Sequence, residues 1–341
     1  MKIIVKKNKI IFDWVLIAKG IGIILVVIGH FSPKLAPNYW VEIIKIIYSF
    51  HMPLFFLLSG FLFNNEKYSY LMLIKLKIKR LLYPFISIAT IFFIIKYSSG
   101  LIFNLENPVK IGNVFSLLSN PLKSYMPLLW FIYALFMIFL IYPILRRIIH
   151  NNYIILIIII MLNIICSNNN YPIIGNALLH IPYFIVGVIF REDCKLRNRI
   201  LFGKMIYIII SGAMFFFIYF IFHGIELVST IGYIVKFMLG ASGAICVINI
   251  SYMLEIKNFF SAQKWLLTQI GFYSMSIYLF HTLFESAIRI ISYQVLLAEF
   301  PLKFIVIALT AIISGIIFPI ILEKMILRKN RFTKKYMLGL E

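Results

Sequence analysis

Charged residues are scarce in this sequence, and acidic ones are the scarcest. Only 13% of the 341 residues are charged, with 12 Asp and Glu against 33 Lys and Arg, whereas 62% are hydrophobic. Such a composition excludes an ordinary soluble globular domain. Because the basic residues fall in the gaps between apolar runs rather than along one solvated face, they indicate contact with a lipid bilayer and argue against a nucleic-acid partner.

Cysteine is also scarce. Cys166, Cys194 and Cys246 are scattered, with no CxxC pair, which excludes a disulfide framework and a zinc site, and we expect no bound metal. The basic N-terminus leads into an apolar stretch that lacks a small-residue cleavage site and is longer than the core of an ordinary signal peptide. We therefore expect an uncleaved first membrane span.

Apolar stretches of about twenty residues are abundant, and each is long enough to cross a hydrocarbon core of ~30 Å as a helix. The sequence holds ten of them, with no stretch that looks like a linker between domains. The predicted fold is all-α: a single polytopic membrane domain over 1–341 without a separate soluble domain. The predicted spans are 10–31, 41–63, 81–97, 127–145, 153–169, 172–190, 203–223, 231–251, 269–292 and 302–322.

The basic residues also predict the orientation of these spans. Most of them lie in alternate connections, such as the segment from Lys75 to Arg80, the pair Arg146 and Arg147, and the tail that follows Lys324. Short basic connections stay in the cytoplasm. With an even number of spans, both termini are therefore predicted to be cytoplasmic, and the alternation supports the count of ten.

The first span carries two ionisable residues, Lys19 and His30, at the ends of the segment KGIGIILVVIGH. Eleven helical residues turn through about 1100°, so both side chains leave the helix on nearly one face, separated by roughly 16 Å along its axis. One face of this helix would thus present a cation and an imidazole at two depths. Lys19 either snorkels toward the cytoplasm or faces a cavity in which it holds a negative group.

Four of the six histidines fall inside predicted spans, namely His30, His51, His180 and His281. In hydrocarbon an imidazole must find partners, so such residues mark pathways or catalytic sites more often than they do in soluble proteins. The ninth span aligns Ser274, Tyr278, His281 and Glu285 on one helical face. Glu285 is placed to accept the N–H of His281 and fix its tautomer, although a polar packing seam between helices would give the same stripe.

Six segments of the chain, taken together and in this order, carry a family resemblance: KGIGIILVVIGH, SFHMPLFFLLSGFLF at 49–63, KLKIKRLLYPF at 75–85, PLLWFIYALF at 127–136, HIPYFIVGVIF at 180–190 and YSMSIYLFH at 273–281. They resemble the bacterial integral-membrane acyltransferase family three, particularly its fucose 4-O-acetylase-like members, which modify surface polysaccharides. The resemblance covers nearly the whole chain. It implies about ten membrane helices in the bacterial cytoplasmic membrane and transfer of an acyl group, usually acetyl, from cytoplasmic acetyl-CoA to a sugar hydroxyl.

The resemblance also points to individual residues. The first motif of the family is an arginine, ten residues and a histidine; the histidine matches His30, whereas Lys19 stands at the arginine position. The charge is kept but the bidentate fork is lost. The second motif matches His51, and the basic third motif matches Arg80, with Lys75, Lys77 or Lys79 where relatives often carry another arginine. The soluble C-terminal esterase-like domain of some relatives has no counterpart here.

These matches lead to an expected division of roles. We expect His30 to be the general base, since the unperturbed pKa of histidine is about 6.5, although the spacing does not distinguish a base from a transiently acylated histidine. His51, His281 and Glu285 are candidates for orienting the substrate or stabilising the oxyanion. The residues expected to hold the acyl-CoA donor are Lys19, Lys75, Lys79 and Arg80.

Two alternatives to a membrane O-acyltransferase stay open at this point. A cavity that spans the bilayer would also suit a transporter or flippase of a lipid-linked sugar, although the chain shows no inverted repeat with matching broken spans. A structural partner of a polysaccharide synthase is the second alternative. The acceptor glycan, its lipid linkage and the oligomeric state are not specified by the sequence.

Overall fold

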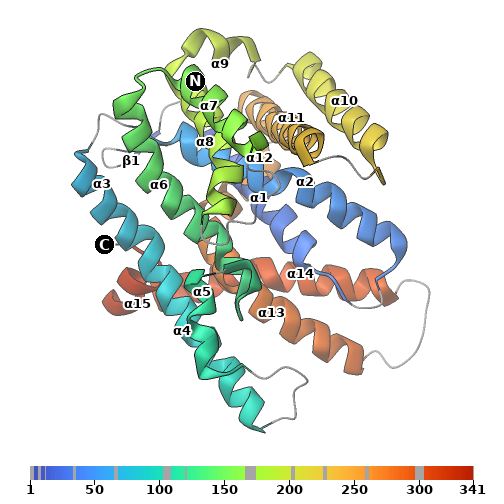
Figure 1. Ribbon diagram of the computed structural model, residues 1–341. Helices are drawn as coiled ribbons and strands as arrows, with labels where there is room; N and C mark the ends of the chain where they lie inside the picture. The colour runs from blue at the N-terminus through green and yellow to red at the C-terminus, as the bar shows by residue number, and fades with distance from the viewer. Residues whose placement is uncertain are drawn as a thin grey trace.

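The computed structural model describes residues 4–340 apart from 7–8, 12, 34–35, 65–67, 103–108, 120, 166–173, 201–203, 226–228, 258–260 and 296–302. Within these ranges the chain is helical except for a short hairpin, in which β1 (Ile4–Lys6) pairs antiparallel with β2 (Lys9–Ile11) (Figure 1). Of the cysteines, Cys166 lies outside the described residues, and Cys194 and Cys246 are free thiols.

The helices follow one another with short connections. In chain order they are α1 (Asp13–His30), α2 (Asn38–Phe61), α3 (Tyr70–Lys77), the π-helix η1 (Ile78–Leu82), α4 (Tyr83–Ile102), the 3₁₀-helix η2 (Ile111–Val114), α5 (Ser116–Ser119), the 3₁₀-helices η3 (Pro121–Lys123) and η4 (Pro127–Leu129), α6 (Trp130–Ile148), α7 (Asn152–Ile165), α8 (Gly175–Glu192), α9 (Cys194–Ile200), α10 (Met205–Phe222), α11 (Ser229–Ile256), α12 (Ser261–Phe272), α13 (Ser274–Val295), α14 (Lys303–Leu322), the π-helix η6 (Glu323–Leu327) and α15 (Arg331–Tyr336).

The prediction of a helical polytopic membrane protein is confirmed. Among the described residues, seven helical segments are long and apolar enough to cross a membrane: α1, α2, the continuous segment from α3 to α4, α6, α10, α11 and α14. α7 is a shorter apolar helix, and α8 and α13 carry more polar residues. Each of the ten predicted spans overlaps a helix, but the count of ten and the cytoplasmic termini stay predictions.

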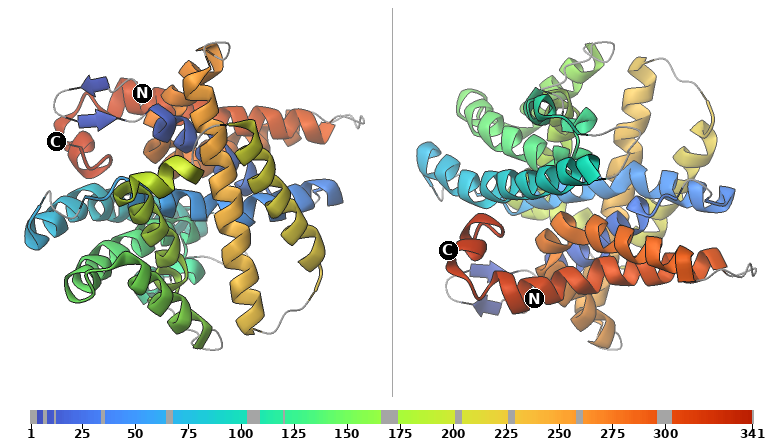
Figure 2. Two further views of the ribbon diagram at one scale, coloured as in Figure 1. Left: turned by 90° about the horizontal axis from the view of Figure 1, so that it is seen from above. Right: turned by 90° about the horizontal axis from the view of Figure 1, so that it is seen from below.

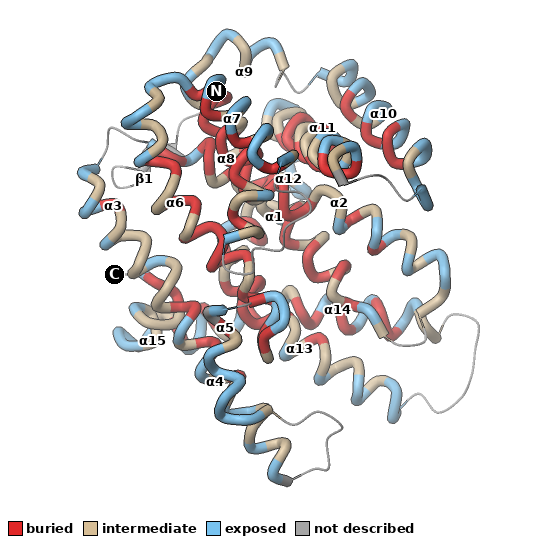
Figure 3. The backbone as a smooth tube through the Cα atoms, viewed as in Figure 1, coloured by how far each residue is buried: buried red, intermediate tan, exposed pale blue. Residues whose placement is uncertain are grey.

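The core of the molecule lies around α1 and α2. Trp14, Ile17, Leu54 and Leu57 on these helices are fully buried, and Figure 3 shows the buried segments concentrated there and on α8. α13 and α14 run side by side along one flank, as the right-hand view in Figure 2 shows. The outermost helices instead expose large apolar side chains, and Phe220 on α10 is 70% exposed. An apolar surface of this kind fits contact with lipid.

Glycines allow α2 and α8 to pack at backbone contact distance. Gly60 of α2 faces Phe184 of α8, and Gly187 of α8 faces Leu57 of α2; a Cβ added at either glycine would collide with the opposing carbonyl oxygen. Small residues at a helix interface are the usual means by which membrane helices approach closely, since lipid supplies no hydrophobic drive for association. This contact holds α8, which carries His180, against α2, which carries His51.

Gly187→Ala should therefore lower the amount of folded protein. The added methyl forces the two backbones apart, and overpacking of this kind costs on the order of 1–3 kcal/mol. We expect a smaller monodisperse peak in size-exclusion chromatography after extraction in detergent, and a lower melting temperature. Gly112→Ala is the matched control, because nothing lies within 4 Å of a Cβ at Gly112; equal stability of the two variants would refute this role of Gly187.

The predicted span 269–292 crosses a helix boundary. α12 ends at Phe272 and α13 begins at Ser274, and α12 packs along α1, where an added Cβ on Gly20 or Gly271 would collide with the facing backbone. At the start of α13, the Ser276 hydroxyl donates to the buried carboxylate of Glu323. The break thus lets α12 follow α1 while α13 turns onto α14 and η6.

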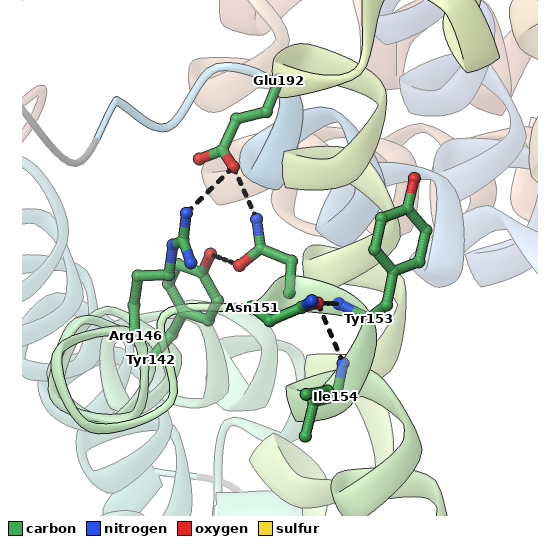
Figure 4. A network of polar contacts seen from close by, with 7 residues as sticks. Tyr142, Arg146, Asn151, Tyr153, Ile154 and Glu192 are labelled. Carbon is green, nitrogen blue, oxygen red and sulfur yellow. Dashed lines mark hydrogen bonds and ion pairs between the residues drawn. The ribbon is translucent and has the colours of Figure 1, made fainter.

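A polar network joins α6, α7 and α8 where the end of α6, the start of α7 and the end of α8 meet (Figure 4). The Tyr142 hydroxyl donates to Asn152 Oδ1 over 2.7 Å, and Asn152 Nδ2 donates to Glu192 Oε2, also over 2.7 Å. Arg146 Nη2 lies 3.4 Å from the same carboxylate, and Asn151 Oδ1 accepts the backbone N–H groups that open α7. The carboxylate of Glu192 on α8 therefore connects this helix to α6 and α7.

Candidate active site

Two cavities lie on the same side of α1. The larger, of about 700 Å³, is called here the histidine cavity, and the smaller, of about 150 Å³, the lysine cavity. Polar and aromatic side chains that line the histidine cavity include His30, His51, His180, Lys45, Lys236, Asn176, Trp130, Tyr48, Tyr183, Tyr233 and Tyr278. The lysine cavity is lined by Lys19, Ile23, Ser59, Leu81, Phe131, Leu135, Ser274 and others. No Asp or Glu occurs among the described residues that line either cavity.

The arrangement predicted for the first span is present. Lys19 and Ile23 line the lysine cavity, His30 lines the histidine cavity, and Val26 lines both. These four residues are spaced 4, 3 and 4 apart, so they share one face of α1. As predicted, the side chains of Lys19 and His30 lie on one face of α1, at two different depths.

Three of the histidines have one ring nitrogen fixed by the backbone. His51 Nδ1 lies 2.8 Å from the carbonyl oxygen of Ile47, and His180 Nδ1 lies 2.8 Å from that of Asn176. His281 Nδ1 is 2.9 Å from the Ile277 carbonyl oxygen. A carbonyl only accepts, so Nδ1 carries the proton in each neutral ring and Nε2 keeps its lone pair.

His30 occupies a different setting. Its ring centroid is 5.2 Å from that of His281 and 6.2 Å from that of Tyr48, and Tyr48 lies 5.3 Å from His51. Within the described part of the chain, no residue forms a hydrogen bond with the His30 ring, and the side chain is half-buried at the cavity wall. Both of its nitrogens are thus available to exchange a proton with a ligand.

The prediction that His281 donates a hydrogen bond to Glu285 is wrong. His281 Nδ1 donates to the backbone instead, and both His281 Nε2 and Glu285 Oε2 are buried with no hydrogen-bond partner among the described residues. The carbonyls of the preceding helical turn reach the ring first. His281 and Glu285 are buried beside the site and do not line either cavity, whereas Ser274 and Tyr278 of the same stripe do.

The basic residues expected to hold the donor separate into two groups. Lys19 lines the lysine cavity, whereas Lys75, Lys79 and Arg80 line neither cavity, and only the next residue, Leu81, reaches the lysine cavity. Lys75 and Arg80 are exposed. Arg80 therefore precedes a lining residue in the sequence, but the basic cluster is not part of the cavity wall.

The C-terminal segment packs on this basic cluster, a contact that the sequence analysis did not anticipate. Gly339, with φ of +63°, lies against the backbone of Lys79 and Arg80, where a side chain would collide. The Ser87 hydroxyl donates to the Tyr336 carbonyl oxygen over 2.9 Å. The basic residues of α15 are in this way brought to the same end of the molecule as those of η1.

Several residues of the histidine cavity were also not selected from the sequence. His180 belongs to the cavity, with its ring 5.1 Å from Trp130 and 4.7 Å from Phe56. Tyr183 donates to the Lys236 carbonyl oxygen over 3.2 Å, and Tyr233 keeps a buried hydroxyl without a hydrogen-bond partner among the described residues. Nothing in the sequence distinguished Tyr183 and Tyr233 as lining residues, because tyrosine is common along the apolar spans.

The lining residues bear on which ligands the site can hold. A search of the described residues finds no group of three His, Cys, Asp or Glu side chains placed to hold a metal ion. Imidazoles with free Nε2 lone pairs supply bases, and the aromatic rings supply flat surfaces for a ligand. The arrangement suits proton transfer at a bound neutral or anionic molecule.

Helices long and apolar enough to cross a membrane, together with a histidine-lined cavity of ligand size, define a polytopic membrane protein with a candidate ligand site. Residues 12–324 match the acyltransferase domain that defines the acyltransferase-3 family, and this match covers nearly the whole chain. The protein belongs to the acyltransferase-3 family and is a membrane acyltransferase. Comparison with curated proteins and with solved structures gave no match.

Proposed function

We propose that this protein is an O-acyltransferase of the bacterial cytoplasmic membrane that moves an acetyl or other short acyl group from acyl-CoA to a hydroxyl of a cell-surface or lipid-linked glycan. The observation that carries the proposal is the pair of adjoining cavities on one face of α1, one with Lys19 and the other with His30. If the acyl donor and the alcohol acceptor come from opposite sides of the membrane, the protein needs two adjoining cavities in which they can meet.

The lysine cavity suits the donor. Its lining is apolar apart from Lys19, Ser59, Ser274 and Tyr278, and the thioester end of acyl-CoA is likewise mostly apolar with a few amide groups. Lys19 supplies a charged hydrogen-bond donor to the amide carbonyl groups of this end of the donor. Arg80 of the basic cluster precedes Leu81 of the cavity wall, and Lys75 and Arg80 are exposed, so the nucleotide phosphates would remain in water there.

The histidine cavity suits the acceptor. Trp130, Tyr48, Tyr183 and Tyr233 line it, and flat aromatic faces are well suited to the C–H faces of sugar rings. Its volume of about 700 Å³ is in the range of sites for small ligands. His30 lines this cavity, beside Val26, where the two compartments adjoin.

In the proposed reaction His30 takes the proton from the acceptor hydroxyl as that oxygen bonds to the thioester carbonyl carbon. The carbon–sulfur bond of the tetrahedral intermediate then breaks, and the protonated imidazole returns its proton to the leaving thiolate, so that protons and charges balance. His51, with its Nδ1 held by the backbone, faces the same cavity and orients the acceptor. His281 lies behind His30 and supports its ring.

Purified protein in liposomes should transfer radiolabel from acetyl-CoA to a lipid-linked or soluble glycan. The reaction should need acetyl-CoA on one side and glycan in the histidine cavity, and mass spectrometry of the product should show acetylation of a hydroxyl. Empty liposomes are the control. Movement of glycan across the bilayer without transfer of label would support a transporter and overturn the proposal.

A further inference from the structure

Three buried residues line both cavities, and together they are called here the junction: Val26 of α1, Met52 of α2 and Tyr278 of α13. They are 1%, 7% and 6% exposed. Each is close in sequence to a histidine, since Val26 precedes His30 by one helical turn, Met52 follows His51, and Tyr278 precedes His281 by three residues. The junction thus separates the lysine cavity from the imidazoles.

Tyr278 is the rigid member of the junction. Its hydroxyl donates to the carbonyl oxygen of Leu128, and its ring packs edge-on against Phe131 at a centroid distance of 5.6 Å. Leu128 lines the histidine cavity and Phe131 lines the lysine cavity. With both its hydroxyl and its ring engaged, Tyr278 forms a fixed wall, and the aliphatic side chains of Val26 and Met52 set the remaining width.

The acyl group must sit at this point during the reaction. If the donor sulfur lies in the lysine cavity and the acceptor oxygen lies beside His30, the acyl carbon between them falls at the junction. The acceptor fills the space beyond, so the acyl chain extends only among Val26, Met52 and Tyr278. None of these side chains carries a charge, and the one hydroxyl is already engaged.

We propose that the junction is the acyl-selectivity filter of this enzyme, that it favours acetyl over longer aliphatic acyl groups, and that Val26 and Met52 determine the limit. This inference rests on the proposed function. It assigns to the hydrophobic residues beside the histidines a task that neither the base nor the donor-binding residues perform. Discrimination by one methylene in an apolar pocket ranges from about 10-fold to 200-fold.

The test compares kcat/KM for acetyl-CoA, propionyl-CoA and butyryl-CoA with a fixed glycan acceptor. Val26→Ala and, separately, Met52→Ala should raise the butyryl-to-acetyl ratio of kcat/KM by about tenfold or more. Val26→Ile adds one methylene and should lower the propionyl-to-acetyl ratio. The opposite direction of these changes in a single assay is a result that general destabilisation does not produce.

Val27→Ala is the matched control. Val27 is the next residue of α1 and equally buried, but it faces α14, with its Cγ1 3.1 Å from the position of a Cβ on Gly315. Its acyl-CoA ratios should equal those of the wild type. Unchanged ratios in folded Val26 and Met52 variants, or equal changes in Val27→Ala, would overturn the filter; wild-type protein that transfers no acyl group from any acyl-CoA would instead overturn the proposed function.

Discussion

His30→Ala should abolish acyl transfer while leaving the amount of protein in the membrane unchanged. Loss of a general base lowers the rate by about 10²-fold to 10⁴-fold. Of the histidines in the histidine cavity, His30 is the one whose ring forms no hydrogen bond within the described part of the chain, and it lies one helical turn from Val26, which lines both cavities. Transfer of labelled acetyl by purified protein measures the effect.

Substitutions of two other histidines show whether the loss of activity is specific to His30. His51→Ala should reduce activity less than His30→Ala, mainly through the KM for the acceptor, because one nitrogen of His51 is tied to the Ile47 carbonyl. His150→Ala is the control for substitution of a histidine as such, since His150 is exposed and lines neither cavity. Full activity of folded His30→Ala would remove His30 as the base, and a greater loss in His51→Ala would transfer that role to His51.

Much of the helical framework was predictable because a membrane span must be apolar over a fixed length. Every predicted span overlaps a helix, and α14 (Lys303–Leu322) begins and ends within one residue of the predicted 302–322. The break at Tyr273 was not predictable in the same way. It depends on how closely α12 approaches α1 at Gly20 and Gly271. The length of an apolar stretch does not predict such contacts between helices.

The face of α1 was predictable because it depends only on helical spacing, and Lys19 and His30 do line adjoining cavities. The partner of His281 was predicted wrongly for a local reason. Spacing of four residues brings Glu285 near, but the carbonyls of Ile277 and Tyr278 lie closer to Nδ1. Side-chain spacing alone leaves this competition from the backbone out of account.

Contacts between distant segments were beyond the sequence analysis. Placement of His180 in the cavity depends on the close packing of Gly60 and Gly187 between α2 and α8. The contact of Gly339 with Lys79 joins residues that lie far apart in the chain. A single sequence contains no periodic signal for either contact, because both arise from the tertiary arrangement of helices.

Lys19→Ala should raise the KM for acetyl-CoA by about 10-fold to 100-fold, with a smaller change in kcat. A charge-assisted hydrogen bond contributes about 1.5–3 kcal/mol, and each 1.4 kcal/mol corresponds to a factor of about ten in affinity. Lys19 lies in the lysine cavity, two helical turns before Val26 at the junction. It therefore acts on the donor before chemistry and should affect binding more than the transfer step.

Lys19→Arg separates charge from shape at this position. The family motif carries arginine there, and the variant keeps the positive charge, so most of the activity and a near-normal KM for acetyl-CoA should return. Lys257→Ala, at an exposed lysine outside both cavities, should leave that KM unchanged. An unchanged KM in folded Lys19→Ala would refute the donor role, because a cation that held the acyl-CoA cannot be removed without weakening its binding. The donor would then depend on the basic residues of η1 and the C-terminal segment packed against them.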